Sequence, residues 1–171
     1  MPLQLYKIAS TEVGSAGAAD ITFSSIPQGY TDLIIKFSGR STGTESSGYA
    51  DGILRFNGTT TNYSERMVYG IGSSATSVSQ SSTGIKWNFG TSSVATASTF
   101  GNSETYIPNY ASSNNKSVSI DTVVENNSAT VNVLALNAGL WSNSAAITSV
   151  SITPGSGSWV QYSTAILYGI L

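Results

Sequence analysis

Apolar and polar residues alternate along most of this 171-residue chain, and this pattern limits what the chain can fold into. In SVSIDTVVE (117–125), Val118, Ile120 and Val124 fall on one face of an extended strand, while Ser119 falls on the other. Residues two apart share a face in a β-strand, whereas a helix repeats its apolar face every 3.6 residues. No helical pattern continues for more than about one turn. The sequence therefore predicts an all-β fold.

Clusters of Gly, Pro, Asn and Ser, which favour turns, separate the predicted strands. Two Ser- and Gly-rich stretches without a strand pattern, 41–50 and 72–84, are predicted to be loops at the rims. The predicted strands are Leu3–Ala9, Asp20–Ser25, Asp32–Arg40, Gly52–Asn57, Glu65–Ile71, Gly84–Phe89, Ser103–Ile107, Ser117–Glu125, Thr130–Leu136, Ala146–Thr153 and Ser158–Tyr168.

Two of the turns predict hairpins. The NNSA stretch joins the strands of Ser117–Leu136, because Asn and Ser tolerate left-handed conformations and bond their own backbone. Pro154 and Gly155 end one strand, and a final strand of Ser158–Tyr168 is expected to pair with it. Many short antiparallel strands favour two packed sheets or a closed barrel. We expect an antiparallel two-sheet β-sandwich of the jelly-roll type, as one domain over residues 1–171.

The stretch SIPQGYTDLIIKFSGR (25–40) combines a turn with a half-buried strand. Leu33, Ile35 and Phe37 share one face of that strand and are predicted to lie in the core. The chain contains 40% hydrophobic residues, which is enough for a substantial core at this length.

Charged residues make up only 9% of the chain, where about a quarter is usual. The surface is therefore expected to be neutral and polar, and the net charge of −2 gives no basic field for phosphates or anionic lipids. Nucleic acid and membrane are not expected partners. The N-terminal sequence has no secretory pattern, so we expect synthesis in a cytoplasm.

The chain has no His and no Cys. This excludes Ser-His-Asp and Cys-His catalysis and removes the most common ligands of transition metals. A hydrolase would need a pair of carboxylates in a cleft, and no spacing of Asp and Glu places such a pair. We therefore expect no enzymatic activity, no cofactor and no metal site.

Aromatic residues among neutral polar ones are the remaining candidates for a binding site. Tyr63, Trp87 and Trp141 are candidate contacts for a glycan or a protein partner, since sugars lay their apolar faces on aromatic rings. The alternative is that most of the aromatic rings belong to the core or to a subunit interface.

Five stretches, in order along most of the chain, resemble small virion proteins and fibre-tip domains of tailed bacteriophages. They are FSSIPQGYTDLIIKFSGRS (23–41), ILRFNGTTTNYSERMVYGIG (53–72), YIPNYASSNNKSVSIDTVVENN (106–127), GLWSNSAAITSVSITPGSG (139–157) and WVQYSTAILYGIL (159–171).

This resemblance implies a jelly-roll-like β-sandwich without enzymatic activity on the exterior of a phage particle. Strand patterns begin at Leu3 with no fibrous shaft before them, which favours a stand-alone capsid decoration, or cement, protein that stabilises neighbouring capsid subunits. The alternative is a receptor- or glycan-binding head of a tail fibre or capsid fibre, with a host-surface glycan as its partner. A polysaccharide-cleaving spike is a third possibility. The resemblance transfers no site residue.

A decoration protein binds a symmetric lattice, so a closed homo-oligomer is expected. We expect a trimer on a local three-fold axis, with the major capsid protein as its partner. The apolar segment Val160–Leu171 is the expected contact between subunits.

Overall fold

The computed structural model describes residues 4–128 and 132–171, and it describes residues 87–89 by their backbone only. This part of the chain is all-β, as the alternation predicted. Its strands are β1 (Leu5–Glu12), β2 (Ile21–Phe23), β3 (Asp32–Gly39), β4 (Tyr49–Phe56), β5 (Tyr63–Ile71), β6 (Ser74–Ser82), β7 (Ile85–Thr91), β8 (Gly101–Ile107), β9 (Lys116–Val124), β10 (Val133–Trp141), β11 (Val150–Pro154) and β12 (Thr164–Ile170).

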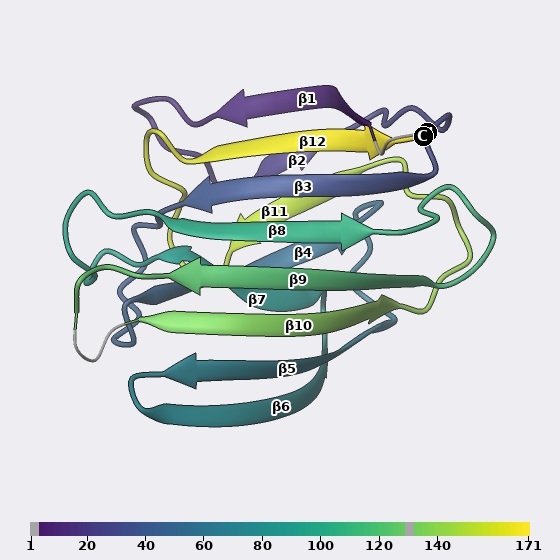
Figure 1. Cartoon of the computed structure of the whole chain (residues 1–171). Helices are drawn as coiled ribbons and strands as arrows, with labels where there is room; N and C mark the ends of the chain where they lie inside the picture. Colours follow the sequence, from purple (N-terminus) through teal and green to yellow (C-terminus); the bar gives the residue numbers. More distant parts are fainter. Residues whose placement is uncertain (1–3, 129–131) are drawn as a thin grey trace.

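The strands form two sheets, and each described pair of neighbouring strands is antiparallel. The large sheet has the order β1-β12-β3-β8-β9-β10-β5-β6, and the small sheet has the order β2-β11-β4-β7. Figure 1 shows the large sheet in front of the small one. The predicted antiparallel two-sheet sandwich is confirmed. The jelly-roll type is not, because that fold has about eight strands in two Greek keys, whereas these strands divide eight to four.

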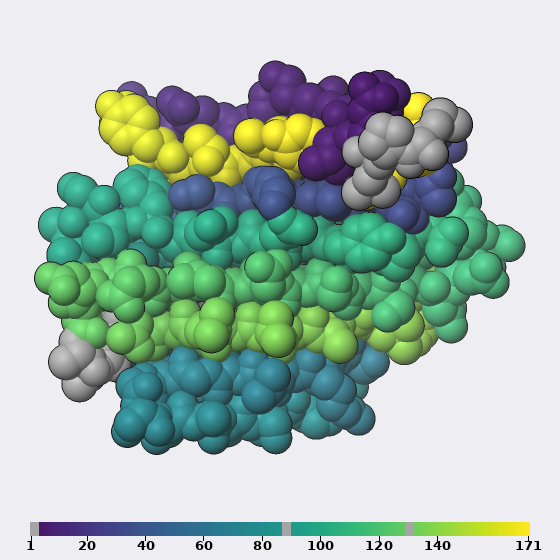
Figure 2. All heavy atoms as spheres, in the orientation of Figure 1, coloured from purple at the N-terminus to yellow at the C-terminus, as the bar shows by residue number. Residues whose placement is uncertain are grey.

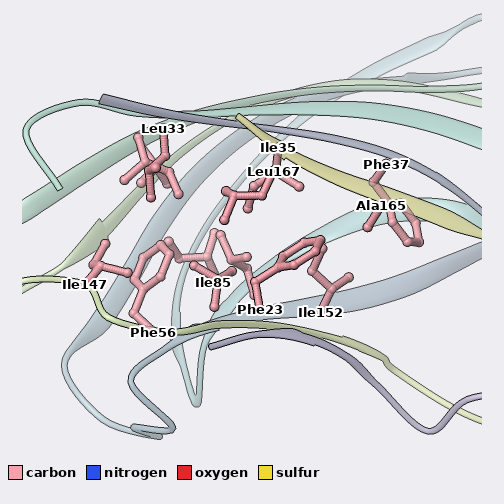
Figure 3. Close-up of a cluster of buried hydrophobic side chains, with 14 of the residues drawn as sticks. Phe23, Leu33, Ile35, Phe37, Phe56, Ile85, Ile147, Ile152, Ala165 and Leu167 are labelled. Atoms are coloured by element: carbon pink, nitrogen blue, oxygen red, sulfur yellow. The ribbon is translucent and has the colours of Figure 1, made fainter. Parts of the chain in front are cut away.

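The core lies between the two sheets (Figure 3). Leu33, Ile35 and Phe37 on β3 are at most 2% exposed, which confirms the prediction made from their alternation. Across the core they face Phe56, Phe23 and Ile152, which come from the small sheet. Full burial of one such side chain stabilises a fold by about 1.5–3 kcal/mol, so this alternation fixes which face of each strand turns inward.

The hairpin predicted over Ser117–Leu136 is confirmed, because β9 pairs with β10. The second predicted hairpin is wrong, since β11 lies in the small sheet and β12 in the large one. The segment between them crosses from sheet to sheet and buries Trp159 completely. The Trp159 indole N–H donates to the carbonyl of Ile152 at 3.0 Å, and its ring packs edge-on against Phe37.

The C-terminal strand is shorter than predicted, and its residues Ala165 and Leu167 pack in the core. Both of its backbone edges are occupied, by β1 on one side and β3 on the other. β12 is therefore an interior strand of its sheet, although Tyr162 and Leu171 beside it are 63% and 67% exposed. The expected subunit contact at Val160–Leu171 stays a prediction. Leu3 and Thr130, at which two of the predicted strands begin, lie outside the described residues.

The loop predicted at 72–84 is also wrong, because most of it forms β6. This strand is rich in Ser and has no apolar face that alternation could reveal. It pairs along its whole length with β5 without a register shift, from Tyr63 opposite Ser82 to Ile71 opposite Ser74. Backbone hydrogen bonding, which the sequence pattern does not record, therefore determines this strand.

Candidate binding groove on the outer face of the large sheet

The face of the large sheet that points away from the small sheet is hollowed over β9, β10, β5 and β6. Figure 2 views the molecule from this side, with β9 and β10 as green bands and β5 and β6 as the teal band next to them. The hollow has a volume of about 660 Å³, and we call it the outer groove. It is lined by Arg66, Met67, Val68, Ser77, Val78, Ser79, Ser119, Ile120, Asp121, Leu136, Asn137 and Ala138.

The strand register places the groove residues in rows across the sheet. Asp121, Leu136, Val68 and Ser77 follow one another across β9, β10, β5 and β6. Directly opposed side chains on one face of a sheet are neighbours, with Cβ atoms about 4.5–5.5 Å apart. Each row therefore presents a continuous line of side chains to a partner.

The adjacent row has the same order of strands. It runs from Ser119 through Ala138 and Arg66 to Ser79. The small Ala138 side chain stands between longer neighbours here. Ala138 is shorter than Leu136 in the neighbouring row, so it leaves more room for a partner above this point of β10.

Four large apolar side chains on this face are exposed, and we call them the apolar strip. Val68, Val123, Leu134 and Leu136 are 51%, 43%, 60% and 59% exposed. They are contiguous, because Leu134 is opposite Val123 and Leu136 is opposite Val68. Single exposed apolar residues are ordinary, but contiguous exposed apolar surface marks a site of interaction.

Charge in and beside the groove is sparse. Arg66 and Asp121 lie on opposite sides of β10, and Arg66 donates to the carbonyl of Glu65 at 3.2 Å. Next to the groove, Lys36 forms an ion pair with Glu104. Hydroxyl and apolar groups make up most of the remaining lining, so a partner would be bound mainly by shape and van der Waals contact.

One pair of carboxylates does occur on this face, because Glu104 lies opposite Asp121 across β8 and β9. A glycosidase needs an acid whose pKa is raised by an apolar pocket, facing a second carboxylate across the substrate. Glu104 is instead ion-paired with Lys36, and both carboxylates stand on an open sheet face. This arrangement does not favour hydrolysis.

A second polar group lies between the sheets and is buried. Glu65, 3% exposed, accepts hydrogen bonds from the Gln80 side chain at 2.6 Å, the backbone N–H of Lys86 at 2.8 Å and the Asn137 side chain at 3.0 Å. Burial raises the pKa of Glu65, and these hydrogen bonds act against the rise. The donors come from β6, β7 and β10, so the carboxylate ties both sheets together.

Two of the aromatic candidates are buried and do not form an exposed rim. Trp141 is 0% and Tyr63 is 4% exposed, and their rings stack with Phe56 beside them. The Tyr63 oxygen accepts the backbone N–H of Phe56 at 2.9 Å and lies 2.9 Å from the hydroxyl of Thr59. Burial raises the pKa of Tyr63. The expectation that Tyr63 and Trp141 are exposed glycan contacts is wrong, because both rings are buried in the core.

Trp87, the third candidate, lies on β7, and its side chain is outside the described residues. The structure therefore brings Tyr63 and Trp141 together in the core and leaves the outer groove to residues that we did not single out. One pattern could have identified them. In VLAL (133–136) and in the neighbouring Val123 and Val124, consecutive residues are apolar, so apolar side chains occur on both faces of the strand. A strand with only one buried face would have polar residues on the other face, so this pattern indicates an exposed apolar surface.

Among residues 4–128 and 132–171, no group of three or more acidic side chains is placed to hold a metal ion. The same residues include no helix that is long and apolar enough to cross a membrane. The outer groove, with its exposed apolar strip, is a surface suited to binding a partner. No family model, curated protein or solved structure matches this chain.

Proposed function

We propose that this chain is a non-enzymatic structural protein of a phage virion. In this proposal it is a capsid decoration protein that binds the outside of the shell and stabilises neighbouring capsid subunits. Its outer groove is the surface that contacts the shell. The major capsid protein is the partner, and the chain acts without cofactor or metal.

The observation that carries the proposal is the apolar strip within a neutral face. Leu134 and Leu136 each leave more than half of their side chains in water. Removing apolar area from water stabilises a contact by roughly 25 cal/mol per Å². Because few charges surround the strip, such a contact changes little with salt. A protein that must stay on a particle outside the cell benefits from that property.

The location on a virion rests on the five stretches that resemble phage virion proteins. A decoration protein is present in many copies, so each contact can be modest while the lattice as a whole is stabilised. The glycan-binding head remains the alternative. Since Tyr63 and Trp141 are buried, that alternative has lost two of its three proposed contacts, and we treat it as an outcome of the test.

The proposal is tested with the double variant Leu134→Ser/Leu136→Ser. Both side chains are exposed, so folding stability should change by less than about 0.5 kcal/mol for each substitution. Binding to phage shells that lack this protein should fall at least about tenfold, because the apolar contact is lost. Co-sedimentation with the shells measures binding, and the thermal transition of the shells measures stabilisation.

Val94→Ser is the matched control, because Val94 is 51% exposed and belongs neither to the outer groove nor to the apolar strip. It should bind like the original chain. Failure of the original chain to bind shells would contradict the decoration proposal, as would a copy number of only a few per particle. Binding to host glycans in place of shells would favour the alternative.

A further inference from the structure

Strand β6 forms one edge of the large sheet. Its only described neighbour is β5, so one side of its backbone carries unpaired N–H and C=O groups. An edge of this kind is a template for another strand, and proteins normally protect it with charges, Pro, bulges or short length. β6 is nine residues long, has no register shift, and contains no charged residue, Pro or Gly.

The other three edges each have a protective feature. β1 has a register shift between Lys7 and Ala9 and carries the charges of Lys7 and Glu12. β2 is only three residues long. The pairing of β7 with β4 has a register shift, and β7 carries Lys86. Among the described edges, only β6 is long, regular and uncharged.

The inner face of β5 and β6 is also incompletely covered. Figure 1 shows both strands extending past β7, the last strand of the small sheet. Met67 and Tyr69 on β5 are only partly buried against a small cluster that includes Val133, and Val78 on β6 is half-buried. Apolar side chains beside an open edge would lose further contact with water if a strand were added there.

We propose that β6 pairs antiparallel with β6 of a second copy of this chain, so that the two large sheets join across a two-fold axis. Centring the axis on Val78 uses all nine residues. Val78 then lies opposite Val78 of the second copy, Ser77 opposite its Ser79, and Ser74 opposite its Ser82.

The residues of β6 suit this self-pairing. Like charges directly opposite one another are destabilising, and in a two-fold pair a charge on the central residue would face its own equivalent. β6 has no charged residue. The central Val78 would meet its own equivalent on the inner face, where Met67 is its neighbour on β5. The contact therefore joins the two partly covered inner faces as well as the backbones.

This pairing closes with two copies, because an antiparallel edge contact is isologous and uses the same strand from each chain. It differs from the trimer that we expected from a three-fold lattice position. A ring of three would need β6 to pair with a different edge, and the other edges are the protected ones. The inference does not depend on the proposed function, since it concerns the chain by itself.

Charges introduced on β6 test the inference. One variant is Ser77→Lys/Ser79→Lys, and the other is Ser77→Glu/Ser79→Glu. Both positions are exposed on the outer face. In the two-fold pair each introduced charge lies opposite a like charge, so dimer affinity should fall by about tenfold or more in each variant. An equimolar mixture of the two variants should restore the dimer, because opposite charges then face one another.

Sedimentation equilibrium of the full chain measures the mass, and a dimer has twice the chain mass of 17.8 kDa. Ser117→Lys/Ser119→Lys is the matched control, since it places the same two charges on the exposed face of β9, a strand inside the sheet. This control should remain dimeric. Circular dichroism and thermal unfolding check that every variant is folded.

Loss of the dimer in both variants with recovery in the mixture would support the β6 pairing. A monomeric or trimeric original chain would overturn it. A dimer that persists in both folded variants would also overturn it, because the contact would then lie elsewhere. If both variants are monomeric and their equimolar mixture does not form the dimer, the register centred on Val78 is excluded.

Discussion

Glu65 shows how one buried carboxylate can be a structural group in a chain with few charges. Its two oxygens accept three hydrogen bonds, from Gln80, Lys86 and Asn137. Asn137 also donates to the carbonyl of Lys86 at 2.6 Å. Buried polar groups are costly unless they are paired, so this network holds β7 of the small sheet at a defined position against β5 and β10 of the large sheet.

Glu65→Ala should lower the free energy of unfolding by about 3 kcal/mol, because it leaves buried donors on several strands without an acceptor. Urea unfolding followed by circular dichroism measures the change. Glu12→Ala is the control, since Glu12 is exposed on β1, and it should change stability by less than about 0.5 kcal/mol. Equal effects of the two substitutions would show that the network contributes no stability.

At the scale of elements, Arg40 organises the loop 92–100 between β7 and β8. Its guanidinium lies past the end of β3 and donates four hydrogen bonds of 2.9–3.2 Å to backbone carbonyls of this loop, and burial lowers its pKa. The acceptors are Ser93, Ala95, Thr96 and Thr99. A planar group with several fixed donors suits this task better than the single ammonium of a lysine.

Arg40→Ala should release this loop while the strands remain paired. Hydrogen exchange of the amides in residues 92–100 should accelerate by at least about tenfold, because local opening no longer breaks bonds to a charged donor. Arg40→Lys should give an intermediate rate. Arg66→Ala, which removes an exposed arginine from β5, is the control and should leave the exchange of the loop unchanged. Unchanged exchange in Arg40→Ala would show that the loop is held by other contacts.

At the scale of the whole molecule, two acids with raised pKa values, the buried Glu65 and the more exposed Asp51, couple stability to pH. Burial raises the pKa of Glu65, and burial together with the nearby Glu45 raises the pKa of Asp51. An acid whose pKa is higher in the folded state holds its proton more tightly there. Its contribution to stability is therefore complete below the unfolded pKa and is lost as pH rises through the folded pKa.

The free energy of unfolding should accordingly fall as pH rises above 4.5, the ordinary pKa of a glutamate. Glu65→Gln removes one of the two titrating groups, so the slope of stability against pH should become shallower. Urea unfolding at about pH 4 and pH 7 measures it. Ser64→Ala, a neutral change at the neighbouring position of β5, should keep the original slope. A steeper slope in Glu65→Gln would falsify the assigned direction.

The core and the strand positions were largely predictable, because the period of two is a local property of a strand. Leu33, Ile35 and Phe37 were identified in this way. The candidate site was not. Tyr63 and Trp141 have the same alternation as binding aromatics on a rim would have, and only their distance from solvent in the folded chain distinguishes the two cases. The exposure of Leu134 and Leu136 likewise depends on which face of β10 the small sheet covers.

The sequence by itself determined that the chain forms antiparallel strands with one buried face, since apolar side chains two residues apart must leave water together. The tertiary structure decided which sheet each strand joined. Nearly all residue types form the same backbone hydrogen bonds. The alternation of side chains therefore does not specify that β11 joins the small sheet and β12 the large one. For the same reason the sequence pattern did not reveal β6, a Ser-rich strand whose position at an open edge of the sheet depends on the pairing of its neighbours.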